Sequence, residues 1–201
     1  MRFMRKLIFL PGALGAAAFW HPVGGRLPAE WQKVYLAWPG LGAQNPDPDV
    51  QGFDDLVRLV EDELTEPSVL VAQSMGGVVA LRAALKHPDK VQGLVLVATS
   101  GGVDVARLGG SDWRADYRAE HPAAARWTTD DWPDHTAELS TVTAPTLLLC
   151  GDRDSISPVA VGEHLASLLP SATLHVLPGG THSLAVDLPD GVAAHIRAYV
   201  A

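Results

Sequence analysis

The sequence predicts an α/β fold with a doubly wound, mainly parallel sheet. Short, uninterrupted apolar runs recur along the chain, helical stretches separate them, and turns rich in glycine and proline close most of the runs. Uninterrupted apolar strands suit a parallel sheet that is covered on both faces, and their alternation with helices favours βαβ units. The chain length of 201 residues suits a single sizeable core, so we expect one domain over residues 1–201.

Composition and charge limit the classes of function. Hydrophobic residues make up 47% of the chain and charged residues 19%, which is typical of a globular protein. Lys and Arg number 15 against 23 Asp and Glu, and this net charge of −8 argues against nucleic acid or an anionic membrane as a partner. The single cysteine, Cys150, excludes an internal disulfide and a cysteine-rich metal site, and its place at the end of an apolar run predicts an inert buried thiol.

The N-terminal stretch imitates a signal peptide. Three basic residues, Arg2, Arg5 and Lys6, precede the apolar run 7–10, and three alanines follow at 16–18. We reject this interpretation because Pro11, Gly12 and Gly15 interrupt the apolar segment early. No run reaches the roughly 18 apolar residues that a membrane span needs. We therefore expect a cytoplasmic protein without a membrane partner.

The first part of the chain yields two strands and one amphipathic helix. Strands are expected at residues 6–10 and 34–38, each followed by a glycine-containing turn, with a loop or helix at 16–31 between them that places His21 on the surface. Apolar residues then recur at helical spacing, which predicts a helix covering one face of the sheet: Phe53, Leu56, Val57, Val60 and Leu64.

Ser74 stands where a strand meets a helix. The apolar run 69–73 leads directly into Ser74, two glycines follow, and a helical run extends over 78–86. Such a turn lifts a hydroxyl clear of the sheet and directs a helix N-terminus at it. Strand and helix crowd together there, and the small residues Ala72 and Gly76 meet that demand. A plain strand-to-helix turn with a polar cap has the same pattern, so this stretch alone leaves both interpretations open.

The later part of the chain continues the alternation after one interruption. Strands are expected at 91–98, 145–150 and 172–177, with helices at 159–169 and 190–200. Residues 102–143 interrupt the pattern with little strand character and four aromatic residues: Trp113, Tyr117, Trp127 and Trp132. Four histidines are not expected to be catalytic: His121 and His135 are predicted on the surface, and His175 and His195 are predicted to be structural.

Two stretches resemble motifs of the α/β-hydrolase family. Residues 72–76, Ala-Gln-Ser-Met-Gly, resemble its nucleophile elbow, Gly-x-Ser-x-Gly, with an alanine in place of the first glycine. Residues 11–15, Pro-Gly-Ala-Leu-Gly, resemble its oxyanion loop, with a proline in place of the usual histidine. The resemblance implies that the backbone N–H groups of Ala13 and Met75 form the oxyanion hole. It covers nearly all of the chain, although the first two strands of the family have no counterpart.

The acid and the base follow from the same resemblance. The stretch Gly-Asp-Arg-Asp after the strand 145–150 resembles the acid loop of the family, and the matching residue is Asp154. Asp152 is a competitor that is expected to brace the loop, and Asp104 is a weaker third candidate. His182 lies after the last strand, where the family has its catalytic histidine. These loops all lie at the carboxyl ends of parallel strands, where such folds place their sites.

The resemblance also interprets the aromatic segment. The family commonly inserts a lid after the strand corresponding to 91–98, and we expect a short helical lid over about 103–143. Its aromatic residues are expected to wall an apolar pocket over Ser74, or simply to be buried in a helical pair, and the two interpretations are compatible. A lid this small favours small or narrow acyl groups.

The predicted function is hydrolysis of a carboxylic ester by a serine hydrolase through an acyl-enzyme. A serine hydroxyl needs a base to take its proton, which is the role expected for His182, and Asp154 is expected to orient the imidazole. No cofactor or metal is implied, because no His, Cys and Asp cluster has ligand spacing. The Ser at position 74 disfavours an aspartate nucleophile. The expected partner is a small-molecule ester, and the sequence predicts no particular oligomeric state.

Other functions of the same family stay open. Thioesterases, lactonases and C–C bond hydrolases use the same fold, and some members cleave the methyl ester of a carrier-bound acyl chain. A ligand-binding member without chemistry is the alternative from another class, and those members usually lack one of the three catalytic residues. Hydrolysis that depends on Ser74 distinguishes an enzyme from a binding protein.

Overall fold

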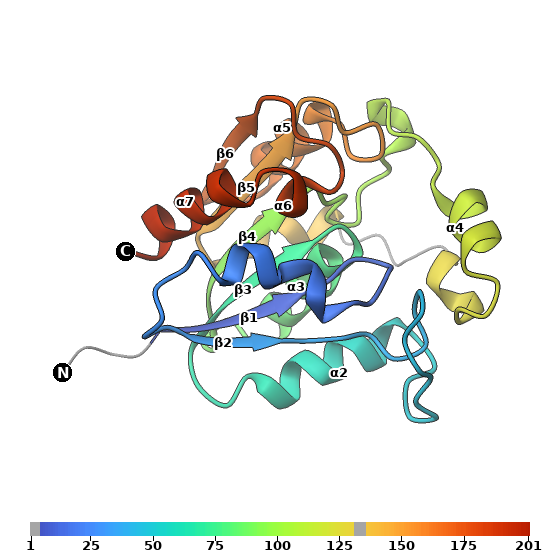
Figure 1. The fold of residues 1–201 in the computed structure, drawn as a ribbon. Helices are drawn as coiled ribbons and strands as arrows, with labels where there is room; N and C mark the ends of the chain where they lie inside the picture. The colour runs from blue at the N-terminus through green and yellow to red at the C-terminus, as the bar shows by residue number, and fades with distance from the viewer. Residues whose placement is uncertain (1–4, 131–135) are drawn as a thin grey trace.

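The computed structural model describes residues 5–130 and 136–201, which form a parallel sheet between two layers of helices (Figure 1). The strand order is β2-β1-β3-β4-β5-β6, and every neighbouring pair is parallel. This confirms the predicted doubly wound sheet. The strands are β1 (Lys6–Leu10), β2 (Gln32–Tyr35), β3 (Ser68–Gln73), β4 (Val91–Val97), β5 (Thr146–Gly151) and β6 (Ala172–Leu177).

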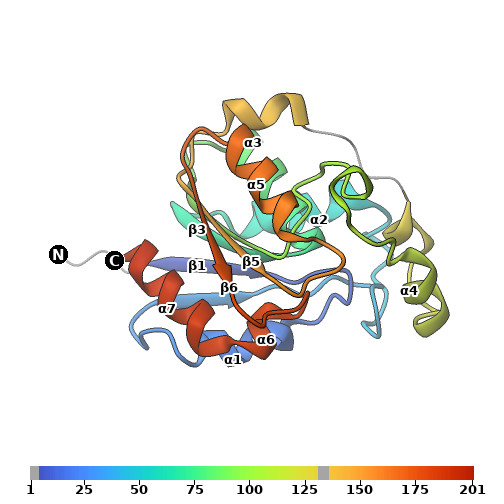
Figure 2. The same cartoon turned by 90° about the horizontal axis from the view of Figure 1, so that it is seen from above.

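The α-helices cover both faces of the sheet (Figure 2). On one face lie α2 (Phe53–Glu63), α3 (Met75–Lys86) and α5 (Val159–Leu168). On the other face lie α1 (His21–Gly24), α6 (Leu184–Asp187) and α7 (Pro189–Val200), together with the 3-10 helix η1 (Ala17–Trp20). Among the described residues, no helix combines the length and the apolar character needed to cross a membrane.

Alternate residues of the strands supply the two halves of the core. In β1, Leu7 and Phe9 pack with α7 on one face, whereas Ile8 and Leu10 pack with the residues of α2 and α3 on the other. All four side chains are fully buried. Burial on both faces is the reason why this strand is a continuous apolar run, and the two apolar layers fix the sheet firmly between its helices.

Two predicted boundaries were wrong by about three residues. The second strand ends at Tyr35 and not at residue 38, because Trp38 turns inward and is fully buried. Its backbone N–H donates to the carbonyl of Gly15 at 2.9 Å. Helix α3 begins at Met75 and not at residue 78, so both glycines after Ser74 belong to its first turn. The other strands agree with the prediction within one residue or two.

Between β4 and β5, residues 106–129 lie beyond the carboxyl ends of the strands (Figure 1), whereas residues 136–141 lie beside α3 and α5 (Figure 2). The described residues between the two strands form one α-helix and three 3-10 helices, namely η2 (Ala106–Leu108), α4 (Arg114–Glu120), η3 (Arg126–Thr129) and η4 (Thr136–Thr141). We call residues 103–143 the β4–β5 segment. Two residues named in the sequence analysis, Trp132 and His135, lie outside the described residues.

Candidate active site

Ser74 occupies a sharp turn between β3 and α3. Its backbone has φ 52° and ψ −121°, a conformation that costs a non-glycine residue of order 1–3 kcal/mol. The N–H of Ser74 donates to the carbonyl of Val97 at 3.1 Å. Its carbonyl accepts hydrogen bonds from the hydroxyl of Thr99 at 2.6 Å and from the N–H of Gly77 at 2.9 Å. These bonds hold the strained turn in place at the start of α3.

Two glycines allow the backbone to pack tightly around this turn. A Cβ atom on Gly76 would lie 2.5 Å from the carbonyl oxygen of Pro11, so a side chain there would push α3 away from the loop after β1. A Cβ atom on Gly12 would collide with the side-chain amide oxygen of Gln73. Ala72 is fully buried at the end of β3. The crowding explains why the sequence has small residues at these positions.

The structure brings together the three side chains that the sequence analysis singled out. The imidazole of His182 lies between the other two: its Nε2 is 2.9 Å from Ser74 Oγ, and its Nδ1 is 2.9 Å from Asp154 Oδ2. The Asp154 side chain is fully buried. Its Oδ1 accepts hydrogen bonds from the backbone N–H groups of Ile156 at 2.8 Å and Ser157 at 2.9 Å. These donors orient the carboxylate toward the imidazole.

The two competing acids lie elsewhere. Asp152 is exposed, and its Oδ1 accepts a hydrogen bond from the backbone N–H of Gly179 at 2.6 Å, so it braces the loop that leads to His182. Asp104 is also exposed and forms an ion pair with Arg107 at 3.1 Å. Within residues 5–130 and 136–201, neither carboxylate contacts the imidazole. Asp154 is therefore the acid that the geometry favours.

Gln73 is a further site residue that was not predicted from the sequence. It is 5% exposed, and its side-chain amide Nε2 donates a hydrogen bond to the backbone carbonyl of His182 at 3.2 Å. The other end of the same amide packs against Gly12. Gln73 therefore connects β3, the loop after β1 and the loop of His182. The available signal was a polar residue at the end of an otherwise apolar strand.

Two buried tryptophans hold the loop after β1. The indole of Trp20 donates to the carbonyl of Leu10 at 2.9 Å, and the indole of Trp38 donates to the carbonyl of Pro11 at 2.7 Å. Both tryptophans are fully buried. Because the two carbonyls are consecutive, the start of the loop is fixed from two sides before it reaches the position of the predicted oxyanion donor.

Tyr117 of α4 connects the β4–β5 segment to the same loop. Its hydroxyl donates to the carbonyl of Ala13 at 2.8 Å and accepts from the N–H of Gly42, also at 2.8 Å. Burial raises the pKa of Tyr117. The N–H groups of Ala13 and Met75, the predicted oxyanion donors, make no hydrogen bond to another residue in the described part of the chain. Both donors therefore remain available to a ligand.

The larger of two cavities at Ser74 has a volume of about 680 Å³. Ser74, His182 and the loop after β1 line it, and its apolar wall consists of Leu14, Phe19, Trp113, Tyr117 and Ile156. Two of the four aromatic residues of the β4–β5 segment therefore wall the cavity. Trp127 packs instead against the apolar core. His121 also lines the cavity and is half-buried, so the predicted surface position of this histidine was wrong.

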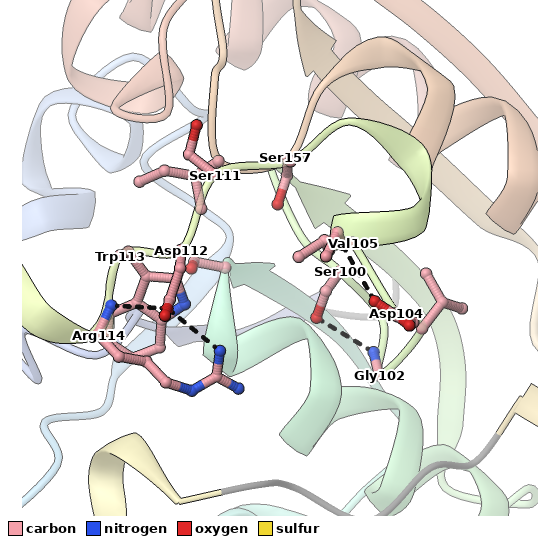
Figure 3. A pocket seen from close by; sticks show the side chains of 14 residues that line it. Ser100, Gly102, Asp104, Val105, Ser111, Asp112, Trp113, Arg114 and Ser157 are labelled. Atoms are coloured by element: carbon pink, nitrogen blue, oxygen red, sulfur yellow. Dashed lines mark hydrogen bonds and ion pairs between the residues drawn. The ribbon is translucent and has the colours of Figure 1, made fainter.

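The smaller cavity has a volume of about 470 Å³ and also reaches Ser74 (Figure 3). Ser100 and Val105 lie on one side of it, Trp113 and Arg114 lie on the other, and Ser157 lies between the two groups. Neither His182 nor the loop after β1 lines this cavity. The two cavities therefore share Ser74 but differ in which of the other site residues they reach.

The remaining candidate groups are not placed for chemistry. In the part of the chain that the structure describes, no three His, Cys, Asp or Glu side chains are grouped to hold a metal ion. Burial, with the nearby charges of Asp154 and Glu163, raises the pKa of Cys150 to about 12, so its thiol stays protonated, as the sequence predicted for an inert cysteine. His175 and His195 pack against each other with ring centroids 4.4 Å apart.

Comparison with known proteins gives consistent matches. The model of the Alpha/beta hydrolase family matches residues 7–140. A pimeloyl-acyl-carrier-protein methyl ester esterase from Neisseria meningitidis is 27% identical over 221 residues, which cover 87% of this chain and 85% of that protein. A 2-succinyl-6-hydroxy-2,4-cyclohexadiene-1-carboxylate synthase from Escherichia fergusonii is 26% identical and covers 94% of this chain and 91% of that protein.

A solved structure shares the fold. The thermophilic esterase from Thermogutta terrifontis superimposes with a TM-score of 0.77 at 24% sequence identity, covering 98% of this chain and 89% of that chain. This similarity shows that the two proteins share a fold.

Proposed function

The chain belongs to the α/β-hydrolase family and is a hydrolase, and on this premise we propose that it cleaves a carboxylic ester with a small or narrow acyl group. Ser74 is the proposed nucleophile, His182 the general base and Asp154 the residue that orients the imidazole. The backbone N–H groups of Ala13 and Met75 are the proposed oxyanion donors. In this proposal residues 1–201 form one domain, and residues 103–143 are its lid.

Acylation begins when Ser74 Oγ attacks the ester carbonyl carbon. His182 Nε2, 2.9 Å from that oxygen, takes the proton as the new C–O bond forms. The carbonyl oxygen becomes negative, and two N–H donors that are already in place stabilise it without reorganisation. The C–O bond to the alcohol then breaks, and Nε2 returns its proton to the departing alcohol oxygen.

Deacylation repeats these steps with water. His182 takes a proton from water as the water oxygen attacks the acyl carbon, and the proton then returns to Ser74 Oγ when the carboxylic acid leaves. The negative Asp154 carboxylate stabilises the imidazolium that forms in both halves of the reaction. Each half of the reaction needs an imidazole that can accept a proton at its start.

The hydrogen-bonded chain from Asp154 through His182 to Ser74 carries this proposal. Both hydrogen bonds of the imidazole are 2.9 Å long. Ser74, at the end of this chain of hydrogen bonds, lies on a strained turn next to the N–H groups of Ala13 and Met75. Side chains and backbone N–H groups of this chain supply every group that the acyl-transfer scheme uses, and the scheme uses no cofactor.

Hydrolysis of p-nitrophenyl esters of increasing acyl length tests the proposal. Ser74→Ala is expected to lower kcat by about 10⁴-fold or more while the melting temperature stays close to that of the wild type. Ser140→Ala is a matched control on an exposed serine of η4 and is expected to keep full activity. Equal activity of wild type and Ser74→Ala would contradict the proposed nucleophile. Ligand binding without turnover of any ester, thioester or lactone would favour a binding protein instead.

A further inference from the structure

We propose that the two cavities divide the substrate at Ser74, with the departing alcohol in the larger cavity and the acyl group in the smaller one. The substrate is then an ester of an apolar alcohol and a small, uncharged acid that carries a hydrogen-bonding group. This inference rests on the proposed function and specifies its substrate class. It follows from which residues line each cavity.

The direction of the substrate follows from the tetrahedral carbon. That carbon carries four groups, namely Ser74 Oγ, the oxyanion, the alcohol oxygen and the acyl carbon. The alcohol oxygen must lie within hydrogen-bonding reach of His182 Nε2, because it leaves with the proton held there. His182 and Ala13 line only the larger cavity. The oxyanion and the alcohol therefore lie on that side, and the acyl carbon points into the smaller cavity.

The larger cavity suits an apolar alcohol. Its wall on the side of the loop after β1 includes Leu14, which is 54% exposed, and the half-buried Phe19. The rings of Trp113 and Tyr117 also line this cavity and pack edge to face, with centroids 5.4 Å apart. An apolar group placed against these side chains removes apolar surface from water.

The smaller cavity is lined by hydroxyl groups. Ser157 is 3% exposed, and its hydroxyl makes no hydrogen bond to another described residue. Ser100 accepts a hydrogen bond from the N–H of Gly102 at 3.2 Å, which leaves its own O–H available as a donor (Figure 3). A buried hydroxyl gains most from a ligand that completes its hydrogen bonds. An acid with a hydroxyl or ether group meets this requirement, and a purely aliphatic acid does not.

The charged residues of the smaller cavity are already paired. Asp104 forms its ion pair with Arg107, and Asp112 contacts Arg114 at 3.4 Å. Asp112 also accepts a hydrogen bond from the backbone N–H of Arg114 at 3.0 Å. Both carboxylates already have an arginine partner, so neither is free to pair with a cationic acyl group. The lining itself holds two carboxylates and one guanidinium, which disfavours an anionic acyl group. We therefore infer an uncharged acyl group.

One short loop separates the two cavities and supplies matched variants. Ser155 lines only the larger cavity, Ser157 lines only the smaller one, and Ile156 between them lines both. Ser155→Ala and Ser157→Ala therefore remove the same hydroxyl on opposite sides of the division. The loop follows Asp154, and neither change removes the backbone N–H groups that bond to Asp154.

Four esters, made from two acids and two alcohols, measure the acyl preference and the alcohol preference separately. The acids are 3-hydroxybutanoic and 3-methylbutanoic acid, which differ by a hydroxyl against a methyl group. The alcohols are hexanol and 2-(2-hydroxyethoxy)ethanol, which have equal numbers of non-hydrogen atoms. Each kcat/KM is divided by the rate of hydroxide-catalysed hydrolysis of the same ester. For the wild type we expect hexyl 3-hydroxybutanoate to be the best of the four substrates.

The variants assign each preference to a cavity. We expect Ser157→Ala to reduce the preference for the hydroxy acid by about fivefold with either alcohol, the usual effect of losing one neutral hydrogen bond. Ser155→Ala is expected to leave that preference unchanged. Leu14→Ala is expected to reduce the preference for hexanol by about threefold with either acid, because less apolar surface is buried.

The opposite results have distinct meanings. If Ser157→Ala changes the alcohol preference, or Leu14→Ala changes the acid preference, the substrate is bound in the reverse direction and the inference is wrong. Unchanged ratios in all three variants also overturn it. If Ser74→Ala hydrolyses the four esters as fast as the wild type, the proposed function fails, and the division of the substrate fails with it.

Discussion

Two regions face the same two cavities: the loops that follow the strands, and the β4–β5 segment. The two regions differ in the secondary structure that supports them. The loops after β3, β5 and β6 are each held by backbone hydrogen bonds. Strands β3 and β5 are almost completely buried, whereas β6, at the edge of the sheet, is largely exposed or half-buried. In the described part of the β4–β5 segment, regular structure is limited to one seven-residue α-helix and short 3-10 helices, and most residues there are exposed or half-buried.

This difference separates the proposed chemistry from the proposed selectivity. Ser74, Asp154 and His182 need fixed positions, and the carboxyl ends of hydrogen-bonded parallel strands provide them. The walls formed by Trp113 and Tyr117 need only a suitable shape and polarity, which a segment outside the sheet can supply. We therefore expect changes in the strand loops to lower the rate with every substrate, and changes in the β4–β5 segment to alter mainly the choice among substrates.

Among the strand-loop variants considered next, Asp154→Asn is expected to lower kcat the most. An amide of the same size keeps the packing, but it cannot stabilise the imidazolium and favours the wrong imidazole tautomer. We expect kcat to fall by about 10³–10⁴-fold with p-nitrophenyl esters of every acyl length. Stopped-flow or steady-state assays at neutral pH measure this loss.

Asp152→Asn is the matched control in the same loop. Its side chain accepts a hydrogen bond from the N–H of Gly179, and an asparagine oxygen can accept the same bond. We expect a change in kcat of less than about threefold, because an exposed hydrogen bond of this kind contributes little. The reverse ranking of the two variants would reject Asp154 as the acid.

Much of the sheet and of the candidate site could be predicted because both depend on local patterns. Strand β1 is a continuous apolar run because both of its faces are buried, and that pattern is visible without a structure. Ser74, Asp154 and His182 lie in short loops next to such strands. Once the strands are parallel and in order, the three loops must meet at one edge of the sheet.

The rest depends on contacts between distant residues, which no local pattern reveals. Trp38 ends β2 early because its indole bonds to the carbonyl of Pro11, 27 residues earlier. Gln73 reaches the loop of His182 across 109 residues. His121 lines the larger cavity because α4 is placed by the bonds of Tyr117 and not by any periodicity of its own. These positions follow from packing and could not be read from spacing.

A smaller effect is expected for Gln73→Leu. The change keeps the volume of a buried side chain and removes the amide that donates to the His182 carbonyl. We expect kcat to fall by about tenfold with little change in KM, because one neutral hydrogen bond orients the base rather than the substrate. The rate of Ser74 phosphonylation by a fluorophosphonate probe is expected to fall in parallel.

Gln51→Leu controls for the loss of an amide. Gln51 is exposed and also donates to a carbonyl, that of Pro48 at 2.8 Å, but it lines neither cavity. This variant is expected to keep the wild-type rate. If Gln73→Leu lowers only the melting temperature and leaves kcat and the probe rate intact, then Gln73 has a structural role and does not position His182.

The smallest loss of kcat/KM is expected for Tyr117→Phe. This variant breaks the hydrogen bonds that connect the β4–β5 segment to the loop after β1. The variant loses the hydrogen bonds to the Ala13 carbonyl and the Gly42 N–H but keeps the aromatic wall. Burial raises the pKa of Tyr117 above its ordinary value, so in the wild type the hydroxyl stays protonated and continues to donate through mildly alkaline pH. The connection is therefore present throughout the pH range of the assays.

Comparison of two alcohols with one acid measures what this connection does. We expect Tyr117→Phe to lower kcat/KM by about threefold to tenfold and to change the ratio between hexyl and 2-(2-hydroxyethoxy)ethyl esters, because the freed segment loosens the wall of the larger cavity. Tyr35→Phe, whose ring stacks on Phe9 and lines neither cavity, is expected to change neither quantity. An equal loss with both alcohols would mean that Tyr117 acts on the Ala13 donor alone. Tyr117 would then belong with the strand loops, and the boundary between chemistry and selectivity would run through α4.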